Sequence, residues 1–266
     1  MVRQMRTKEE SSPYRRPGFL LGAAVVGIIV VMGIAVAISS ALRPDPATAP
    51  PVAPTPTAPT SSTDPGEDQN GPPGEQTDPD ASVCGLPGFV QTGTLTAPPE
   101  GSSWRLAGRT AVPYSDQAGP GEFDPTTGMG TCFAHTPEGA VTATATIMAT
   151  TLKADTVLQA TEYFVVPGPG KDAAVARIQE QLAAGEVPDE EATSVQVAGF
   201  RVLSYNSDRA TIELAFDYAT GGTGAFRYEL EWIDGDWRYR VADDGGMLGS
   251  AQQVDDMTNY VEWRGI

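Results

Sequence analysis

The hydrophobic and polar positions divide the chain into stretches with different patterns. Residues 19–42 form one apolar run without a charged side chain, whereas residues 43–82 contain hardly any bulky apolar residue. Between about residues 136 and 184, apolar residues recur every three or four positions, which predicts helices. From Val195 onward, apolar and polar residues alternate, which predicts strands. The chain therefore divides into a tail (1–18), a membrane-length run (19–42), a spacer (43–82) and a folded domain (83–266).

Three helices are predicted in the periodic stretch. The first runs from Thr136, a suitable N-cap before a proline, to about Leu152. The second starts with Asp155 as its cap and stops before Pro167. The third covers about residues 171–184, and its apolar residues lie on one face: Ala174, Val175, Ile178 and Leu182.

Four strands joined by short turns follow the helices. They cover Val195–Tyr205 and about residues 211–218, 226–232 and 237–241. A group of helices followed along the chain by an antiparallel meander is an α+β pattern, in which the helices cover the apolar face of the sheet. The other face carries charged residues that either form cross-strand ion pairs or bind a partner: Glu213, Asp217, Arg227, Glu229, Glu231, Arg238 and Arg240.

The apolar run is long enough to span a bilayer as a helix, since about 20 apolar residues cross a hydrocarbon core of about 30 Å. Five cations precede it and only Arg43 follows closely, which favours a cytoplasmic N-terminus and an extracellular domain. The alternative is a cleaved signal peptide, because residues 35–37 have the small-x-small form of a cleavage site. We expect an uncleaved single-pass anchor at residues 19–42.

The spacer contains eleven prolines and scattered acidic residues. Such a composition cannot bury enough surface to offset its ordering entropy, so we expect it to be disordered with polyproline II character. It either holds the domain away from the bilayer or is an incidental low-complexity segment.

The chain has two cysteines, Cys84 and Cys132, 48 positions apart and both on the predicted oxidising side of the membrane. A disulfide between them is the leading interpretation, and it would stabilise the fold by roughly 4 kcal/mol in the chain-entropy model. Two buried free thiols or an intermolecular bridge are the alternatives.

The net charge of −17 is distributed unevenly. Residues 1–18 carry five cations and two anions, residues 43–82 one and seven, and residues 83–266 eleven and twenty-five. An acidic outer domain has no basic face, so direct binding of nucleic acid by this domain is excluded. With one histidine and two cysteines in the chain, a Cys/His-rich zinc module is excluded as well.

No motif of the sequence predicts catalysis, a cofactor or a metal, so we expect a protein that is not an enzyme. His135 lies next to the helix cap, where a role in ordering the backbone is favoured over catalysis. Asp243–Asp244 and Asp255–Asp256 lack the ligand spacing of a calcium loop. Three alternating tyrosines either line a pocket or belong to the core: Tyr218, Tyr228 and Tyr239.

Two segments of the domain resemble the nuclear transport factor 2-like fold, in which helices pack on a curved antiparallel sheet. These are DRATIELAF (208–216) and YELEWIDGDWRYRV (228–241). CFAHTPEGAV (132–141) and the final YVEWRGI (260–266) resemble motifs of uncharacterised actinobacterial single-pass membrane proteins associated with integrative conjugative elements.

A short tail, one membrane helix and an outer domain of this fold is similar to the plan of the bitopic assembly factors of type IV secretion channels. The resemblance implies a scaffold that contacts other envelope or transfer-channel proteins. Cell-entry-associated lipid-importer accessory proteins share this plan, and the fold class also includes small-ligand-binding and enzymatic domains.

Overall fold

A computed structural model of the chain describes residues 80–107, 109–186 and 194–265. The chain divides into two units, Met1–Gln76 and Thr77–Ile266, and every described residue belongs to the second. The predicted membrane run at 19–42 and nearly all of the predicted spacer lie outside the described residues. None of the helices within the described ranges is long and apolar enough to cross a membrane.

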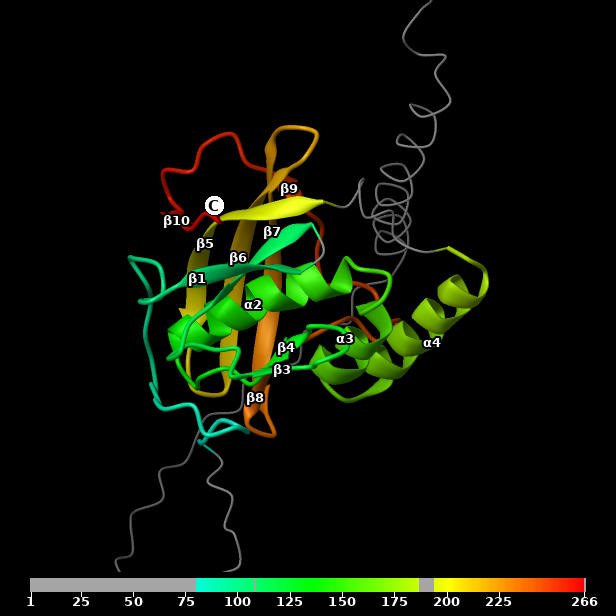
Figure 1. Cartoon of the computed structure of the whole chain (residues 1–266), viewed down its shortest axis with the longest axis horizontal. Coiled ribbons are helices and arrows are strands. Elements are labelled where there is room, and N and C mark those ends of the chain that lie inside the picture. Colours follow the sequence, from blue (N-terminus) through cyan, green and yellow to red (C-terminus); the bar gives the residue numbers. More distant parts are fainter. Residues whose placement is uncertain (1–79, 108, 187–193, 266) are drawn as a thin grey trace, which may run out of the picture. The chain divides into compact units, whose positions relative to one another are not determined.

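The described part has three α-helices and mostly antiparallel strands, which confirms the predicted α+β class (Figure 1). The helices are α2 (Pro137–Thr151), α3 (Val157–Phe164) and α4 (Pro169–Ala183). The strands are β1 (Ser103–Ala107), β2 (Thr110–Tyr114), β3 (Glu122–Phe123), β4 (Gly130–Thr131), β5 (Val195–Tyr205), β6 (Arg209–Tyr218), β7 (Thr223–Ile233), β8 (Asp236–Tyr239), β9 (Gln252–Gln253) and β10 (Val261–Glu262).

The main sheet has six strands in the described part of the chain instead of the predicted four. Its order is β10-β5-β6-β7-β8, and β9 pairs with β7 beyond the end of β8. The four predicted strands are its long members, β5 to β8. Strands β9 and β10 have two residues each, too few for an alternation that the sequence could show. They lie in the C-terminal segment, which returns along both edges of the sheet.

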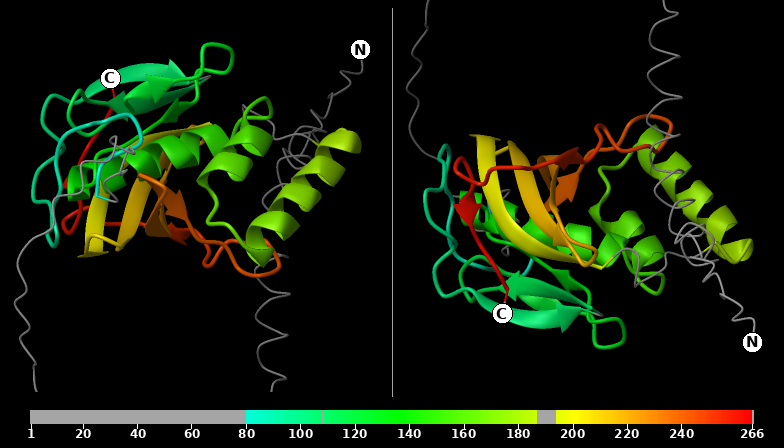
Figure 2. Two further views of the ribbon diagram at one scale, coloured as in Figure 1. Left: turned by 90° about the horizontal axis from the view of Figure 1, so that it is seen from below. Right: turned by 90° about the horizontal axis from the view of Figure 1, so that it is seen from above.

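The sheet curves around helix α2, as Figure 2 shows. Strand β5 contributes two register shifts against β6, between Val197 and Gly199 and between Val202 and Ser204. Such bulges bend a strand and increase its twist. Gly199 is needed at the first shift, because a Cβ there would lie 2.6 Å from the Val261 carbonyl oxygen of β10.

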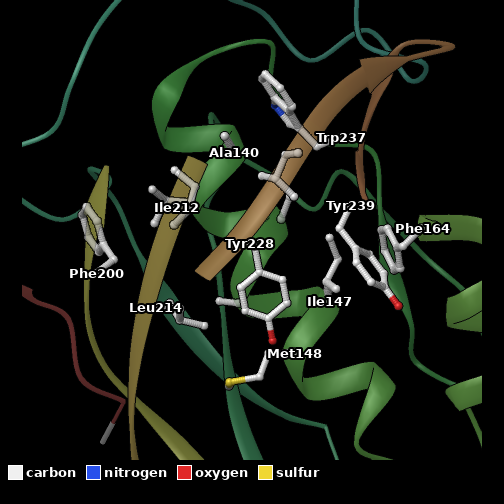
Figure 3. Packing of buried hydrophobic residues seen from close by; sticks show 14 of the residues in the cluster. Ala140, Ile147, Met148, Phe164, Phe200, Ile212, Leu214, Tyr228, Trp237 and Tyr239 are labelled. Carbon is white, nitrogen blue, oxygen red and sulfur yellow. The ribbon is translucent and has the colours of Figure 1, made fainter. Parts of the chain in front are cut away.

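Helix α2 lies between the sheet and the β1–β2 hairpin, so it is covered on two sides (Figures 1 and 2). Figure 3 shows Ile147 and Met148 of this helix packed against side chains of β6, β7 and β8. Tyr228 and Tyr239 belong to this core, whereas Tyr218 lies at the surface. The largest side chains of the cluster with almost no exposed surface are Trp237, Phe133, Phe164 and Phe200.

Two details of the helices differ from the prediction. Helix α3 has Thr156 as its N-cap residue, and Asp155 instead forms an ion pair with Lys153 at 3.2 Å. Helix α4 begins at Pro169, two residues before the predicted start. By contrast, the cap of α2 is as predicted, since the Thr136 hydroxyl accepts a hydrogen bond from the Gly139 N–H.

Candidate interaction site

A pocket of about 140 Å³ lies where the end of α3 and the α3–α4 connection meet the β7–β8 turn. Its walls combine apolar side chains with two acidic and two basic residues: Glu162, Tyr163, Val165, Pro167, Lys171, Ile233, Asp234 and Arg238. Pockets that take small-molecule ligands measure about 300–1,000 Å³. The volume here suits one side chain better than a whole small molecule.

The α3–α4 connection also covers the free edge of strand β8. Val165 forms a parallel bridge with Tyr239, and the Val166 N–H donates to the Tyr239 carbonyl oxygen at 3.0 Å. The outer edge of this part of the sheet is therefore closed, and the pocket lies beside that closure.

Arg238 and Tyr163 line the pocket, and the buried Asp236 holds Tyr163 in place. The guanidinium of Arg238 lies 3.8 Å from the centre of the Tyr163 ring and donates to the Tyr163 carbonyl oxygen. The Tyr163 hydroxyl donates to the buried Asp236 carboxylate at 2.8 Å. Burial, with the nearby Asp236 charge, raises the pKa of Tyr163 above its ordinary value, so this hydroxyl stays protonated. The arrangement orders a binding surface and provides no activated nucleophile.

Asp236 is fully buried, and its carboxylate organises the chain around the pocket. It accepts backbone N–H bonds from Cys132 at 2.9 Å, from Phe133 at 3.0 Å and from Trp237 at 2.9 Å. Burial raises the pKa of Asp236, and the hydrogen bonds from Tyr163 and from the backbone N–H groups of Cys132 and Phe133 act in the opposite direction. The side chain thus joins β8 to the segment before α2.

Helix α4 stands beside the pocket and is attached to the domain near its start. Only Gly170 and Ala174 are buried, where the helix meets the loop at residues 242–246. Arg177 donates to the Gly245 carbonyl oxygen at 2.5 Å. The predicted apolar face is thus only partly covered, since Val175, Ile178 and Leu182 remain half-buried. The second half of α4 presents this half-buried apolar face beside exposed polar residues.

The outer face of the sheet confirms the interpretation of its charges as ion pairs for most of the predicted residues. Glu213 of β6 lies between Arg201 of β5 and Arg227 of β7, and it also accepts from the Tyr260 hydroxyl at 2.6 Å. Further pairs join Arg209 and Arg240 to Glu231, and Arg264 to Asp217. Arg238 is different, because it turns around the sheet edge to Tyr163.

Glu213 is the most buried acid of this face. Burial alone would raise the pKa of its carboxyl group. The hydrogen bonds from Tyr260 and Arg201, with the attraction of Arg201 and Arg227, outweigh burial and hold the pKa below its ordinary value. The carboxylate therefore stays charged and fixes three strands and the C-terminal segment together.

The predicted disulfide between Cys84 and Cys132 is confirmed, with an S–S distance of 2.12 Å. It joins the start of the described chain to the residues that precede α2. The segment Asp80–Cys84, which we call the junction segment, is fixed further by the Val83 N–H, which donates to the Gly235 carbonyl oxygen at 2.8 Å. The carbonyl oxygen of Asp80 also bonds to a ring nitrogen of His135, so folded contacts begin before the predicted domain start at residue 83.

The other candidates from the sequence have structural roles. Both ring nitrogens of His135 bond to backbone carbonyl oxygens, which agrees with a role in backbone ordering. Asp244 and Asp256 accept N–H bonds within their own loops, from Gly246 and Thr258. Among the described residues, no group of three or more His, Cys, Asp or Glu side chains could hold a metal ion.

The pocket itself could not be found from the sequence. Its residues come from α3, the α3–α4 connection, α4 and the β7–β8 hairpin, and the most distant two, Glu162 and Arg238, are 76 positions apart. Arg238 is the one pocket residue that the sequence pattern singled out, and the alternation of apolar and polar residues along the strand predicted that it lies on the outer face of the sheet with the other arginines.

A family described as "domain of unknown function (DUF8175)" matches residues 63–262 of the chain. The match covers about three quarters of the sequence, so the chain belongs to this family. No curated protein and no solved structure matches the chain.

Proposed function

We propose that this member of the DUF8175 family is a single-pass membrane protein whose outer domain is an interaction scaffold, with its N-terminus in the cytoplasm. The observation that carries the proposal is the disulfide in a domain that follows an apolar run flanked by cations. Disulfides persist in oxidising compartments, and the cations favour a cytoplasmic tail. Both features favour the same orientation.

The candidate interaction site supports a protein partner. The pocket is the size of one side chain, and interfaces commonly place an anchor side chain in such a pocket. Helix α4 beside it has a half-buried apolar face next to exposed polar positions. The acidic domain would steer a basic partner towards this surface through its electrostatic field.

The conjugative role rests on the resemblance to the bitopic assembly factors of type IV secretion channels. Helices packed on one face of a curved antiparallel sheet suit that resemblance. The proposed partners are therefore other envelope or transfer-channel proteins. Genes for a transfer ATPase and a relaxase beside this gene would favour that role, and lipid-importer genes would favour a cell-entry-associated one.

Orientation can be measured with cysteines introduced one at a time, because both native cysteines are joined in the disulfide. A membrane-impermeant maleimide added to intact cells should label Gln253→Cys, which is exposed in the domain. It should label Ser11→Cys in the tail only after lysis. Labelling of the tail cysteine in intact cells would overturn the proposed orientation.

Partner contact can be measured with a photo-crosslinking amino acid in the full chain, expressed in its host. We expect crosslinks to envelope proteins from Gln179 on the exposed face of α4, and few from the matched exposed position Gln117. Lys171→Ala should reduce the crosslinks from Gln179, since Lys171 lines the pocket. Equal crosslinking from both positions, or a small molecule retained by the purified domain, would favour the ligand-binding or enzymatic alternative.

A further inference from the structure

The only histidine of the chain, His135, lies buried where three parts of the domain meet. Its Nδ1 is 3.0 Å from the carbonyl oxygen of Asp80 in the junction segment. Its Nε2 is 2.5 Å from the carbonyl oxygen of Ser207 in the β5–β6 turn. The ring connects the start of the described chain to the main sheet from the segment before α2.

Aromatic rings enclose the same imidazole. Trp232 of β7 stacks on it with a centroid distance of 3.9 Å and an angle of 8°. Trp237 of β8 and Phe89 make T-shaped contacts with it, with ring centroids at 5.8 Å and 5.0 Å. An indole face is the best aromatic partner for a cation.

We infer that His135 carries a proton on both ring nitrogens and acts as a latch that holds the junction segment on the domain. A carbonyl oxygen only accepts hydrogen bonds, and a neutral imidazole has one N–H donor and one acceptor nitrogen. Two carbonyl partners are therefore both satisfied only by the doubly protonated ring. Charge-assisted hydrogen bonds and the Trp232 face compensate the burial of its charge.

The charged groups on the elements around the ring suit a cation. The two arginines on these elements are engaged elsewhere, Arg209 with Glu231 at 3.3 Å and Arg238 with Tyr163. The remaining groups that carry a charge near neutral pH on the junction segment, the start of α2, the two hairpin turns and β8 are carboxyl groups: Asp80, Glu138, Asp208, Asp234 and Asp236.

The direction of the pH dependence follows from the donor count. The protonated ring makes both hydrogen bonds, so the latch is closed at low pH. When the ring loses its second proton, one nitrogen lone pair faces a carbonyl oxygen, and that contact becomes repulsive. The hold on the junction segment is therefore lost as the pH rises. This inference concerns the domain alone and does not depend on the proposed membrane role.

The single histidine makes the test direct. In the full chain labelled with ¹⁵N-histidine, the ring should show two protonated nitrogens at pH about 5, and it should lose one of these protons in a single step as the pH is raised. The amide exchange protection of Val83 and Val90, which donate to the Gly235 and His135 carbonyl oxygens, should fall several-fold across the same step. A ring with one unprotonated nitrogen at pH about 5, or protection that stays constant across the step, would overturn the inference.

Two variants separate the latch from general loss of structure. His135→Gln should fold. Because its side chain cannot become charged, the amide exchange protection of Val83 should be weaker than in the native chain and should no longer change with pH. Glu213→Gln, which alters a distant acid on the outer sheet face, should keep the step. If His135→Gln fails to fold, the ring nitrogen signals of the native chain still decide the protonation state.

Discussion

Helices α2 and α4 are matched in length and start, yet the domain uses them in opposite ways. Each has 15 residues, and each begins with proline. Thirteen residues of α2 are buried, whereas only two residues of α4 are. Both were predicted as helices with one apolar face, and only the structure separates the buried helix from the peripheral one.

The difference lies in side-chain size more than in the position of the apolar residues. Helix α2 consists largely of Ala, Gly and Thr, which let its backbone approach both the sheet and the β1–β2 hairpin. The buried hydroxyl groups stay within the helix and donate to carbonyl oxygens one turn earlier, at Thr142, Thr144, Thr146 and Thr150. A helix can therefore be buried all round without apolar residues at every position.

The largest expected effect is at Gly139 in the first turn of α2. A Cβ there would lie 1.9 Å from the Ala134 carbonyl oxygen, and the backbone between them has no room to move in the buried layer. We expect Gly139→Ala to reduce the free energy of unfolding by about 5 kcal/mol. Urea denaturation followed by circular dichroism would measure this, or show that the variant does not fold.

Gly170 in the first turn of α4 is the matched control. A Cβ there would lie 2.5 Å from the Ala242 carbonyl oxygen, a less severe clash than the one at Gly139. Helix propensity favours alanine over glycine by about 1 kcal/mol and offsets part of the clash, so we expect Gly170→Ala to cost about 2 kcal/mol. Equal losses in the two variants would break the distinction between the helices.

The disulfide should have the next largest effect, because it fixes the chain just before the buried helix. Cys132 lies five residues before Pro137, and the crosslink closes a loop of 48 residues. We expect Cys84→Ala with Cys132→Ala to reduce the free energy of unfolding by about 4 kcal/mol. Reduction of the native protein should give the same loss, and non-reducing mass spectrometry should show the two cysteines in one linked peptide pair.

The two helices can also be compared with the same substitution, because each contains an isoleucine. Ile147 of α2 has no exposed surface, whereas Ile178 of α4 is half-buried. We expect Ile147→Ala to cost about 3 kcal/mol, because it leaves a cavity in the core. Ile178→Ala should cost about 1 kcal/mol or less, since water already reaches that site. If Ile178→Ala proved the more costly variant, α4 would have to be part of the core.

The elements with a clear period could be predicted from the sequence, and the rest could not. The Thr136 cap marks the start of α2. The Asp234–Gly235 turn, with alternating residues on both sides, marks the β7–β8 hairpin. Residues 85–130 show little periodicity, yet they contain β1 to β3 and the first residue of β4. Those strands depend on tertiary partners: the Gln196 side chain of β5, for example, accepts from the Ala111 N–H at 2.9 Å. A pattern within one segment does not show such a contact.

The candidate interaction site shows the same limit. The cysteine pair was predictable, because two cysteines allow one intramolecular pairing. The contact of Arg238 with Tyr163 was not, because β8 is an edge strand. Its side chain can turn around the edge to α3, which alternation along the strand does not reveal.

The outer face of the sheet is held in place by charge, whereas helix α2 is held by packing. The folded-state pKa of Glu213 is below its ordinary value of 4.5, so its stabilising contribution is present above that value and lost as the pH falls. We expect Glu213→Gln to cost about 2 kcal/mol at pH 7, and the difference from the native protein to shrink in acid. The raised pKa of Asp236 acts in the opposite sense, but it is common to both proteins and cancels in the difference. Urea denaturation of both proteins between pH 7 and pH 3 would measure the difference, and a constant value would show that Glu213 is not ionised in the native domain.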